Sequence, residues 1–303
     1  MLLDGACVLV TGANGFVGAR VAHRLAGSGA RVHALVRRRG TSQLLDAPGI
    51  TEVEGDVTDH GTCLGVAAGV QAVVHCAATA GDDLAEVRRV NVGATRAILD
   101  AARAAEVLRF VHVSTAAVYD RGDHLLIDES VPRVTEGDPY PLTKAEAERE
   151  VETAAFAGLA TTILRPPAVL GWAPTSTWGQ RIPERIRDGD LPPTRAAGDT
   201  FAFVHVDDLA DAVRVALEQD AAVGGTYDVV GGCATWGEYV DEVRSWFPAA
   251  PDPIDRDLAP TWTGLIRGDR LAEELGFRPR RDFAVGMAEA ADHWVADRAG
   301  GDH

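Results

Sequence analysis

The sequence lacks long hydrophobic runs and has little positive charge. No apolar stretch approaches the ~20 residues needed to span a bilayer, so we expect no membrane-spanning segment. The chain has 29 lysines and arginines against 45 aspartates and glutamates, a formal net charge of −16 at pH 7. Such an acidic chain is repelled by nucleic acids and anionic membrane surfaces. We therefore expect neither as a partner, and a phosphate-bearing ligand must be held by a local pocket.

Cysteines are also few, and they are scattered. Cys7, Cys63, Cys76 and Cys233 form no C-x-x-C pair. This pattern favours free thiols in a reducing cytosol over disulfides or a metal site. The first residues, MLLDGACVLV, lack the basic region and cleavage site of a signal peptide. We therefore expect a cytoplasmic protein with no bound metal.

What the chain does contain is an alternation of short apolar runs and helix-periodic segments. With 303 residues, 46% of them hydrophobic, it can form one large α/β domain or a core with a smaller appendage. The alternation predicts βαβ units and a parallel sheet covered by helices on both faces. Strands are predicted at residues 8–10, 31–36, 50–53, 72–75, 110–113, 161–164 and 226–230, a strand entering a helix at 203–209, and helices at 140–155, 235–247, 269–275 and 283–295.

A glycine-rich turn joins the first strand to the first helix, in the sequence VLVTGANGFVG of residues 8–18. Gly12 allows a tight turn, Gly15 lets backbone amides approach a pyrophosphate, and Gly18 lets the helix lie close to the strand. The unpaired N–H groups and dipole at this helix end favour an anion. The context of strand, turn and helix predicts a dinucleotide-binding loop.

Two further groups of polar residues have a spacing that suits proton transfer. Tyr140 and Lys144 lie one helical turn apart on one face. A nearby ammonium favours the phenolate, so we expect Lys144 to lower the pKa of Tyr140 from ~10. Ser114 and Thr115 follow the predicted strand at residues 110–113, where open α/β sheets bind ligands. A hydroxyl there can donate a hydrogen bond to a substrate oxygen.

Together these segments resemble the extended short-chain dehydrogenase/reductase superfamily, in its epimerase/dehydratase-like branch. The resemblance covers nearly the whole chain and rests on TGANGFVG (11–18), GDV (55–57), HCAA (75–78), NVGAT (91–95), VSTAAVY (113–119), YPLTK (140–144), LRPPAVLG (164–171), FVHVDDL (203–209) and LGFRP (275–279). It implies a Rossmann-type doubly wound parallel sheet over residues 1–170, with a returning segment near 200–230. A smaller C-terminal lobe over residues 171–303 is expected to bind the substrate.

The resemblance also implies roles for single residues. Tyr140 is expected to be the general acid/base and Lys144 its electrostatic partner and ribose ligand. Thr115 is expected to polarise the substrate oxygen, with Ser114 as the alternative. Asn91 is expected to support the site, whereas His75 and His205 are expected to be structural. The expected cofactor-binding residues are Gly12, Asn14, Gly15, Phe16, Val17, Gly18, Arg37, Arg38, Asp56, Val57, Ala77, Ala78, Asn91, Tyr140, Lys144 and Pro166.

The phosphate state of the cofactor follows from the end of the second strand. A site that prefers NAD places a carboxylate there to accept from the ribose 2′-hydroxyl. This chain has Val36 at that place, followed by Arg37 and Arg38. Because a guanidinium can pair bidentately with a 2′-phosphate, we expect NADP to be preferred over NAD.

Two differences from the sugar-nucleotide members of this superfamily limit the reactions that the chain could catalyse. Dehydratases carry Asp-Glu where this chain has Ala116-Ala117, and epimerases carry Asn where it has Ala168. The first departure argues against dehydration, and the second weakens the nucleotide-sugar interpretation. Against that, residues 185–207 and the tail resemble the sugar-active members. The arginines that could meet a diphosphate are Arg181, Arg185, Arg187 and Arg195.

The leading hypothesis is a ketoreductase or dehydrogenase that acts on a secondary alcohol or ketone of a sugar nucleotide or a similar polar metabolite. The alternatives are an epimerase that retains NAD, and a non-catalytic dinucleotide-binding sensor. We expect the substrate cleft beside Trp172 and Trp178. By the resemblance, we expect a homodimer formed through residues 84–105 and 140–156.

Overall fold

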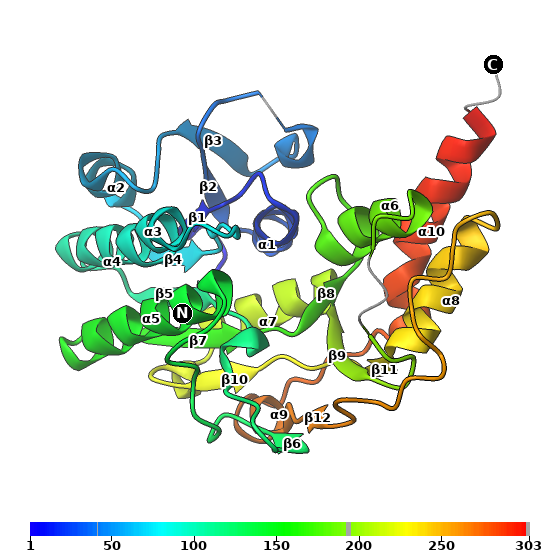
Figure 1. The fold of residues 1–303 in the computed structure, drawn as a ribbon. Helices are drawn as coiled ribbons and strands as arrows, with labels where there is room; N and C mark the ends of the chain where they lie inside the picture. The colour runs from blue at the N-terminus through cyan, green and yellow to red at the C-terminus, as the bar shows by residue number, and fades with distance from the viewer. Residues whose placement is uncertain (41, 192–194, 301–303) are drawn as a thin grey trace.

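The structure, a computed structural model, describes residues 1–40, 42–191 and 195–300. Within these residues, seven strands form one sheet in the order β10-β7-β5-β4-β1-β2-β3 (Figure 1). Every pairing in it is parallel, so the predicted Rossmann-type class is confirmed. The strands are β1 Cys7–Thr11, β2 Arg31–Val36, β3 Ile50–Glu54, β4 Ala72–His75, β5 Arg109–Val113, β7 Thr161–Arg165 and β10 Thr226–Asp228.

Helices cover both faces of this sheet because its strands are apolar on both sides. On one face, α1 (Phe16–Ala26) packs with α7 (Val206–Glu218), and α9 (Asp269–Leu275) completes the layer. On the other face lie α2 (His60–Ala67), α4 (Ala94–Ala104) and α5 (Pro139–Phe156). The short helix α3 (Leu84–Arg88) runs through a π-helical turn at Arg89–Gly93 into α4. Asp59 caps α2 by accepting from the backbone N–H of Thr62 (2.6 Å).

The alternation of side chains along β5 decides which residues face the helix α5. Val111 and Val113 belong to the core on the α1 side, whereas Phe110 belongs to the core that includes α5. Because side chains alternate along a strand, His112 points to the same face as Phe110. This parity brings polar residues of β5 against the buried face of α5.

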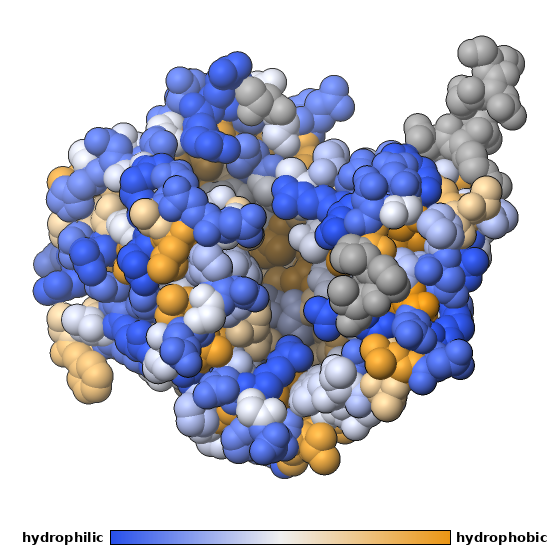
Figure 2. Space-filling model, viewed as in Figure 1, coloured by the Kyte–Doolittle hydropathy of each residue, from blue (hydrophilic) through white to orange (hydrophobic). Residues whose placement is uncertain are grey.

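A smaller lobe follows the sheet (Figure 1). Its sheet has the order β11-β9-β8, with β9 parallel to β8 and antiparallel to β11. Aromatic side chains, among them Phe201, Trp236 and Tyr239, fill its core. The face seen in Figure 2 is hollowed between the main sheet's helices and this lobe. The elements are β8 Ala168–Leu170, β9 Thr200–His205, β11 Gly232–Thr235, α6 Ile182–Arg187, α8 Trp236–Trp246 and α10 Phe283–Gly300, and the small pair β6 Leu126–Ile127 and β12 Leu265–Ile266 lies nearby.

This lobe was predicted only in part. The strand entering a helix that was predicted at residues 203–209 is present, since β9 ends at His205 and α7 begins at Val206. The three-stranded sheet itself was not predicted, since β8 and β11 are too short to show a period. Within the segment 200–230, β10 and α7 belong to the main sheet and its covering helices, while β9 belongs to the lobe. In the described part of the chain, no helix combines the length and hydrophobicity needed to cross a membrane.

Candidate active site

The glycine-rich turn forms a backbone cradle that side chains would fill. Gly12 has a φ of +64°, which L-residues rarely adopt, and a Cβ there would lie 2.7 Å from the backbone nitrogen of Ala77. A Cβ on Gly18 would overlap the carbonyl oxygen of Gly12. The backbone N–H of Gly15 donates to the same carbonyl (3.0 Å). The turn therefore leaves the N-terminus of α1 open to a close-packed ligand.

A cavity of about 290 Å³ opens beside this cradle, at the carboxyl ends of β1, β2, β3 and β4. Bare backbone at a helix N-terminus and a groove between strand ends suit a dinucleotide. The residues present therefore fit the cofactor that the sequence predicts. The predicted cofactor-binding residues that line this cavity are Gly12, Asn14, Gly15, Arg37, Asp56, Val57, Ala77 and Ala78.

The far wall of this cavity carries both signs of charge. Asp56 Oδ1 accepts from the backbone N–H and the hydroxyl of Thr58, both at 2.8 Å. These hydrogen bonds, with the charges of Arg37 and Arg89, lower the pKa of Asp56. Arg37 and Arg89 both line the cavity. The carboxylate is therefore ionised, on a wall that also carries the guanidinium groups of Arg37 and Arg89.

Other residues predicted to bind the cofactor lie elsewhere. The side chain of Phe16 packs with Ala173 and Val206 and lines a second cavity, so any contact with a dinucleotide would use its backbone. Gly18 acts through helix packing. The remaining ones are not among the described residues that line the cofactor cavity, namely Val17, Arg38, Asn91, Tyr140, Lys144 and Pro166.

Asn91 instead supports the cavity from behind. Its Oδ1 accepts from the backbone N–H of Thr79 (2.8 Å), and its Nδ2 donates to Thr79 O (2.9 Å) and to Thr143 Oγ1 (3.0 Å). Thr79 follows the Ala77-Ala78 stretch, and Thr143 precedes Lys144. This buried amide therefore ties the cofactor loop to the helix that carries the predicted acid/base.

His75 makes a similar structural link. Thr95 Oγ1 donates its proton to Asn91 O (2.6 Å), so it accepts from His75 Nε2 (3.0 Å). His75 Nδ1 then accepts from the Thr11 hydroxyl (2.7 Å), which in turn accepts from the backbone N–H of Ala77 (3.3 Å). Burial lowers the pKa of His75 to about 3, which keeps the ring neutral. The structural role predicted for His75 agrees with these contacts.

The predicted proton-transfer residues meet at the carboxyl end of β5. Tyr140 is the second residue of α5, and a hydrogen bond joins its side chain to that of Thr115. Ser114 faces the other way, toward the buried carboxylate of Glu148, whose pKa it helps to lower. Of the two hydroxyls considered from the sequence, Thr115 is therefore the one that lies beside the phenol.

The prediction that Lys144 lowers the pKa of Tyr140 is wrong for this structure. Burial raises the pKa of Tyr140, and the hydrogen bond from Thr115 offsets this only in part. The ammonium of Lys144 donates to Val113 O (2.9 Å) and to His112 Nε2 (3.3 Å). Lys144 is buried, and burial lowers its own pKa to about 8. The phenol is therefore held in its protonated form.

Two residues near Lys144 were missed at the level of sequence. Glu148 lies one turn beyond Lys144 on α5 and binds Arg165 through both oxygens (2.9 and 2.6 Å). Its charge raises the pKa of Lys144. His112 lies on the face of β5 that α5 covers. Glu148 could have been found from its helical spacing, because Tyr140, Lys144 and Glu148 lie at i, i+4 and i+8. His112 could have been found from the alternation of side chains along a strand, because it lies two residues before Ser114.

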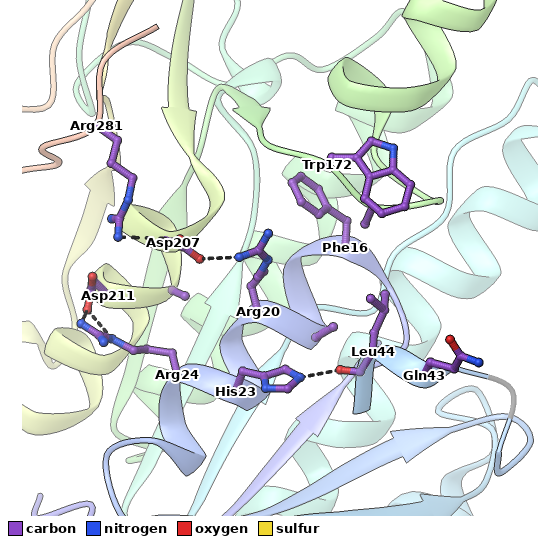
Figure 3. A pocket seen from close by; sticks show the side chains of 13 residues that line it. Phe16, Arg20, His23, Arg24, Gln43, Leu44, Trp172, Asp207, Asp211 and Arg281 are labelled. Carbon is purple, nitrogen blue, oxygen red and sulfur yellow. Dashed lines mark hydrogen bonds and ion pairs between the residues drawn. The ribbon is translucent and has the colours of Figure 1, made fainter. Parts of the chain in front are cut away.

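The lobe's predicted ligand residues are arranged differently from the expectation. Trp178 stacks on Phe201 at 4.7 Å between ring centroids and packs, half-buried, against the aromatic core. Trp172 lines a second cavity of about 620 Å³ between α1 and α7 (Figure 3). In that cavity Arg24 pairs with Asp211. Of the lobe's arginines, Arg187 pairs with Asp188 and Arg185 donates to Asp190 O.

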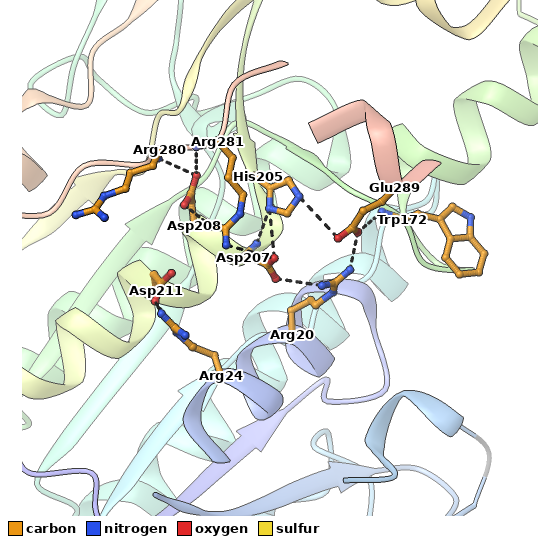
Figure 4. Close-up of polar contacts among 10 residues, drawn as sticks. All are labelled: Arg20, Arg24, Trp172, His205, Asp207, Asp208, Asp211, Arg280, Arg281 and Glu289. Carbon is orange, nitrogen blue, oxygen red and sulfur yellow. Dashed lines mark hydrogen bonds and ion pairs between the residues drawn. The ribbon is translucent and has the colours of Figure 1, made fainter. Parts of the chain in front are cut away.

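One cluster beside this second cavity has donors that a metal could use, namely His205, Asp207 and Glu289 (Figure 4). Arg20 already binds both carboxylates, at 3.1 Å to Asp207 and 2.5 Å to Glu289. His205 Nδ1 accepts from the backbone N–H of Asp207 (3.1 Å), so the neutral ring keeps its proton on Nε2. The cluster therefore joins α1, α7 and α10 as a salt-bridged tie, which agrees with the structural role predicted for His205.

The doubly wound sheet, the glycine cradle and the groove at the switch point define a dinucleotide-binding α/β protein. Residues 8–230 match the NAD dependent epimerase/dehydratase family. The chain belongs to this family, as the sequence motifs predicted.

Individual relatives are reductases and sugar-nucleotide enzymes. The chain is 38% identical over 179 residues (57% of this chain, 53% of the relative) to 4-hydroxy-2-methyl-3-oxo-4-farnesyl-3,4-dihydroquinoline-1-oxide ketoreductase of Stigmatella aurantiaca. It is 33% identical over 218 residues (70% and 65%) to 2-alkyl-3-oxoalkanoate reductase of Stenotrophomonas maltophilia (strain K279a). These matches span about half to two thirds of the relatives' length. The structure of MoeE5 in complex with UDP-glucuronic acid and NAD has the same fold (TM-score 0.81, 24% identity, 97% of this chain and 100% of that one).

Proposed function

We propose that this protein is an NAD(P)-dependent ketoreductase or dehydrogenase that acts on a secondary alcohol or ketone. The observation that carries the proposal is the meeting of Thr115, Tyr140 and Lys144 at the end of β5, on the same sheet edge as the glycine cradle. The two reductases among the relatives support the same reaction class. When bound, the nicotinamide supplies or accepts the hydride.

The chain's own residues would move the proton. Because burial raises the pKa of Tyr140, the phenol is protonated at neutral pH and suited to donate to a carbonyl oxygen that becomes an alcohol. Thr115 would hold the same oxygen through its hydroxyl. Lys144 has three N–H donors, of which two bind His112 and Val113. The third is left for a ribose hydroxyl.

NADP is the proposed cofactor of choice. Arg37 lines the cavity at the end of β2, and Asp56 nearby is engaged with Thr58. We expect Arg37→Ala to weaken NADP binding by about 10- to 150-fold, the equivalent of ~1.5–3 kcal/mol for a hydrogen bond to a charged group. NAD binding should change little, because NAD lacks the 2′-phosphate. Calorimetric titration of both dinucleotides measures the two effects, with the surface variant Arg103→Ala as the control. A wild-type preference for NAD would contradict the proposal.

The substrate is proposed to be polar and anionic, as a sugar nucleotide is. The guanidinium groups of Arg121 and Arg195 stack over Trp262 and Trp236, at 4.6 and 4.8 Å from the ring centroids. Burial and the charge of Arg195 lower the pKa of Arg121, so the two cations lie close enough to repel each other. A phosphate or carboxylate between them would relieve that repulsion. Ketones with and without such a group are the substrates to compare.

An epimerase that retains NAD is the second candidate, since the family includes such enzymes. Net cofactor turnover distinguishes the two reactions. We expect NADPH to be oxidised in a one-to-one ratio with the alcohol formed, followed by absorbance and product analysis. Conversion of a substrate to its epimer without net change in NADPH or NADH would identify an epimerase instead. Tight cofactor binding with no turnover of any carbonyl compound would favour a sensor.

We also propose a cytoplasmic homodimer formed through α3, α4 and α5. Ion pairs bridge these helices on the surface, from Arg88 to Glu146 and from Arg96 to Glu150. They hold the helices in a fixed arrangement against which a second copy could pack. Light scattering in solution tests the oligomeric state.

A further inference from the structure

Lys144 is the only lysine in the chain, whose other basic side chains are all arginine or histidine. A guanidinium stays charged at any working pH, whereas a buried ammonium can lose its proton. The protein therefore uses a titratable amine at a single position, where burial brings its pKa to about 8. The groups that fix the position of this amine and keep it protonated therefore determine whether Lys144 can serve the site.

The partner of this amine on the strand side is His112. The ring is fully buried on β5 and pairs in register with His75 on β4, at 5.4 Å between ring centroids. Burial and the nearby charge of Lys144 keep the pKa of His112 well below its usual value, so the ring is neutral. Its Nε2 lies 3.3 Å from Lys144 Nζ. An ammonium has no lone pair, so Nε2 accepts and the ring proton lies on Nδ1.

This tautomer has a cost that needs an explanation. Nδ1 is buried and has no hydrogen-bond partner among the described residues. A buried N–H without an acceptor is unfavourable, and such groups in native proteins usually reflect a functional constraint. An apolar side chain would fill the same space without that cost. What the His112 ring offers and an apolar side chain lacks is therefore a hydrogen-bond acceptor, Nε2.

We propose that His112 is a positioning residue that accepts a hydrogen bond from the Lys144 ammonium and holds it, charged, at the carboxyl end of β5. With Val113 O it fixes two of the three N–H donors and so aims the third at the cofactor site. The inference rests on the proposed function in that Lys144 serves the reaction. The other groups that interact with Lys144 are Glu148, whose charge favours the ammonium, and Cys76 and His75, which are neutral at pH 7.

The single lysine makes a direct test possible. In the full chain labelled with ¹³C- and ¹⁵N-lysine, one side-chain signal reports the titration of Lys144, with neither substrate nor dinucleotide present. We expect a pKa of about 8 in the wild type and a fall of about one unit or more in H112L, because an acceptor for the charged form is lost. H112Q, whose amide oxygen can accept, should restore most of the shift. H33Q, on β2 of the same sheet, should leave the pKa unchanged.

Activity should follow the same titration. The protonated amine is the active form, so kcat/KM should fall as the pH rises through the pKa of Lys144, and this fall should move to lower pH in H112L but not in H33Q. A merely structural role would lower stability without moving the profile. If H112L does not fold, the tautomer of His112 in the wild-type protein still tests the proposal. In ¹⁵N correlation spectra we expect a proton on Nδ1 and none on Nε2.

The outcomes separate this inference from the proposed function. An unchanged Lys144 pKa in folded H112L, an equal shift in H33Q, or a wild-type ring protonated on Nε2 would overturn the role of His112. None of these affects the proposal for Tyr140. A protein that turns over no ketone or alcohol would refute the proposed function and leave the titration result standing.

Discussion

Replacing Tyr140 by phenylalanine should lower kcat by about 10²- to 10⁴-fold, the usual contribution of a general acid or base. The variant keeps the ring that packs at the start of α5 and removes only the hydroxyl that is hydrogen-bonded to Thr115. Cofactor affinity should stay similar, because the glycine cradle and the 290 Å³ cavity do not include this hydroxyl. Steady-state kinetics with NADPH and a titration of dinucleotide binding give the two values.

Tyr227→Phe provides the matched control. The Tyr227 hydroxyl donates to Glu274 (2.8 Å) and lies among the helices behind the sheet. Its removal should alter stability by no more than about 1–2 kcal/mol and leave kcat near the wild-type value. If Tyr140→Phe turned over substrate at the wild-type rate, Tyr140 would have no part in the chemistry. If both variants lost activity equally, the loss would reflect folding.

Gly18→Ala should destabilise the protein and remove most dinucleotide binding. The added Cβ would overlap the Gly12 carbonyl oxygen and approach Ala13 Cα at 3.0 Å, so α1 would have to move off β1. Overpacking of this kind costs about 1–3 kcal/mol or more, and binding should weaken by about tenfold or more because the helix N-terminus shifts from the pyrophosphate. Denaturant unfolding and dinucleotide titration measure both effects.

Gly65→Ala is the control for this substitution. Gly65 lies on α2, and a Cβ there would meet no atom within 4 Å. Alanine at an exposed helical glycine should stabilise by about 0.4–1 kcal/mol and leave binding unchanged. Wild-type dinucleotide affinity in a folded Gly18→Ala variant would show that the cofactor does not use this turn.

Much of the fold could be predicted because its signals are local. The strand that becomes β4 was predicted at its observed bounds, 72–75, and α9 at 269–275. Apolar runs, helical periods and caps such as Asp59 act within a few residues, so they can be identified before any contact is known. The strands β8 and β11 escaped prediction because three or four residues carry too little pattern, and they exist through pairing with β9.

The candidate site divides in the same way. Tyr140 and Lys144 could be found from their spacing, but the sign of the pKa change at Tyr140 could not. That sign depends on burial, which comes from packing with segments far along the chain. The packing of Trp178 on Phe201 could not be predicted for the same reason, since an aromatic residue in a proline-rich loop fits either a cleft or a core.

By itself, then, the sequence determined the order of strands and helices, the glycine turn and the pair of residues proposed for proton transfer. Only the tertiary structure decided that Thr115 rather than Ser114 faces Tyr140, and that Asn91 ties Thr79 to Thr143. It also decided that Lys144 meets His112, which lies 32 positions away in the chain. These hydrogen bonds and this burial involve residues that are far apart in the sequence and are brought together by the sheet. They therefore cannot be predicted from neighbouring residues along the chain.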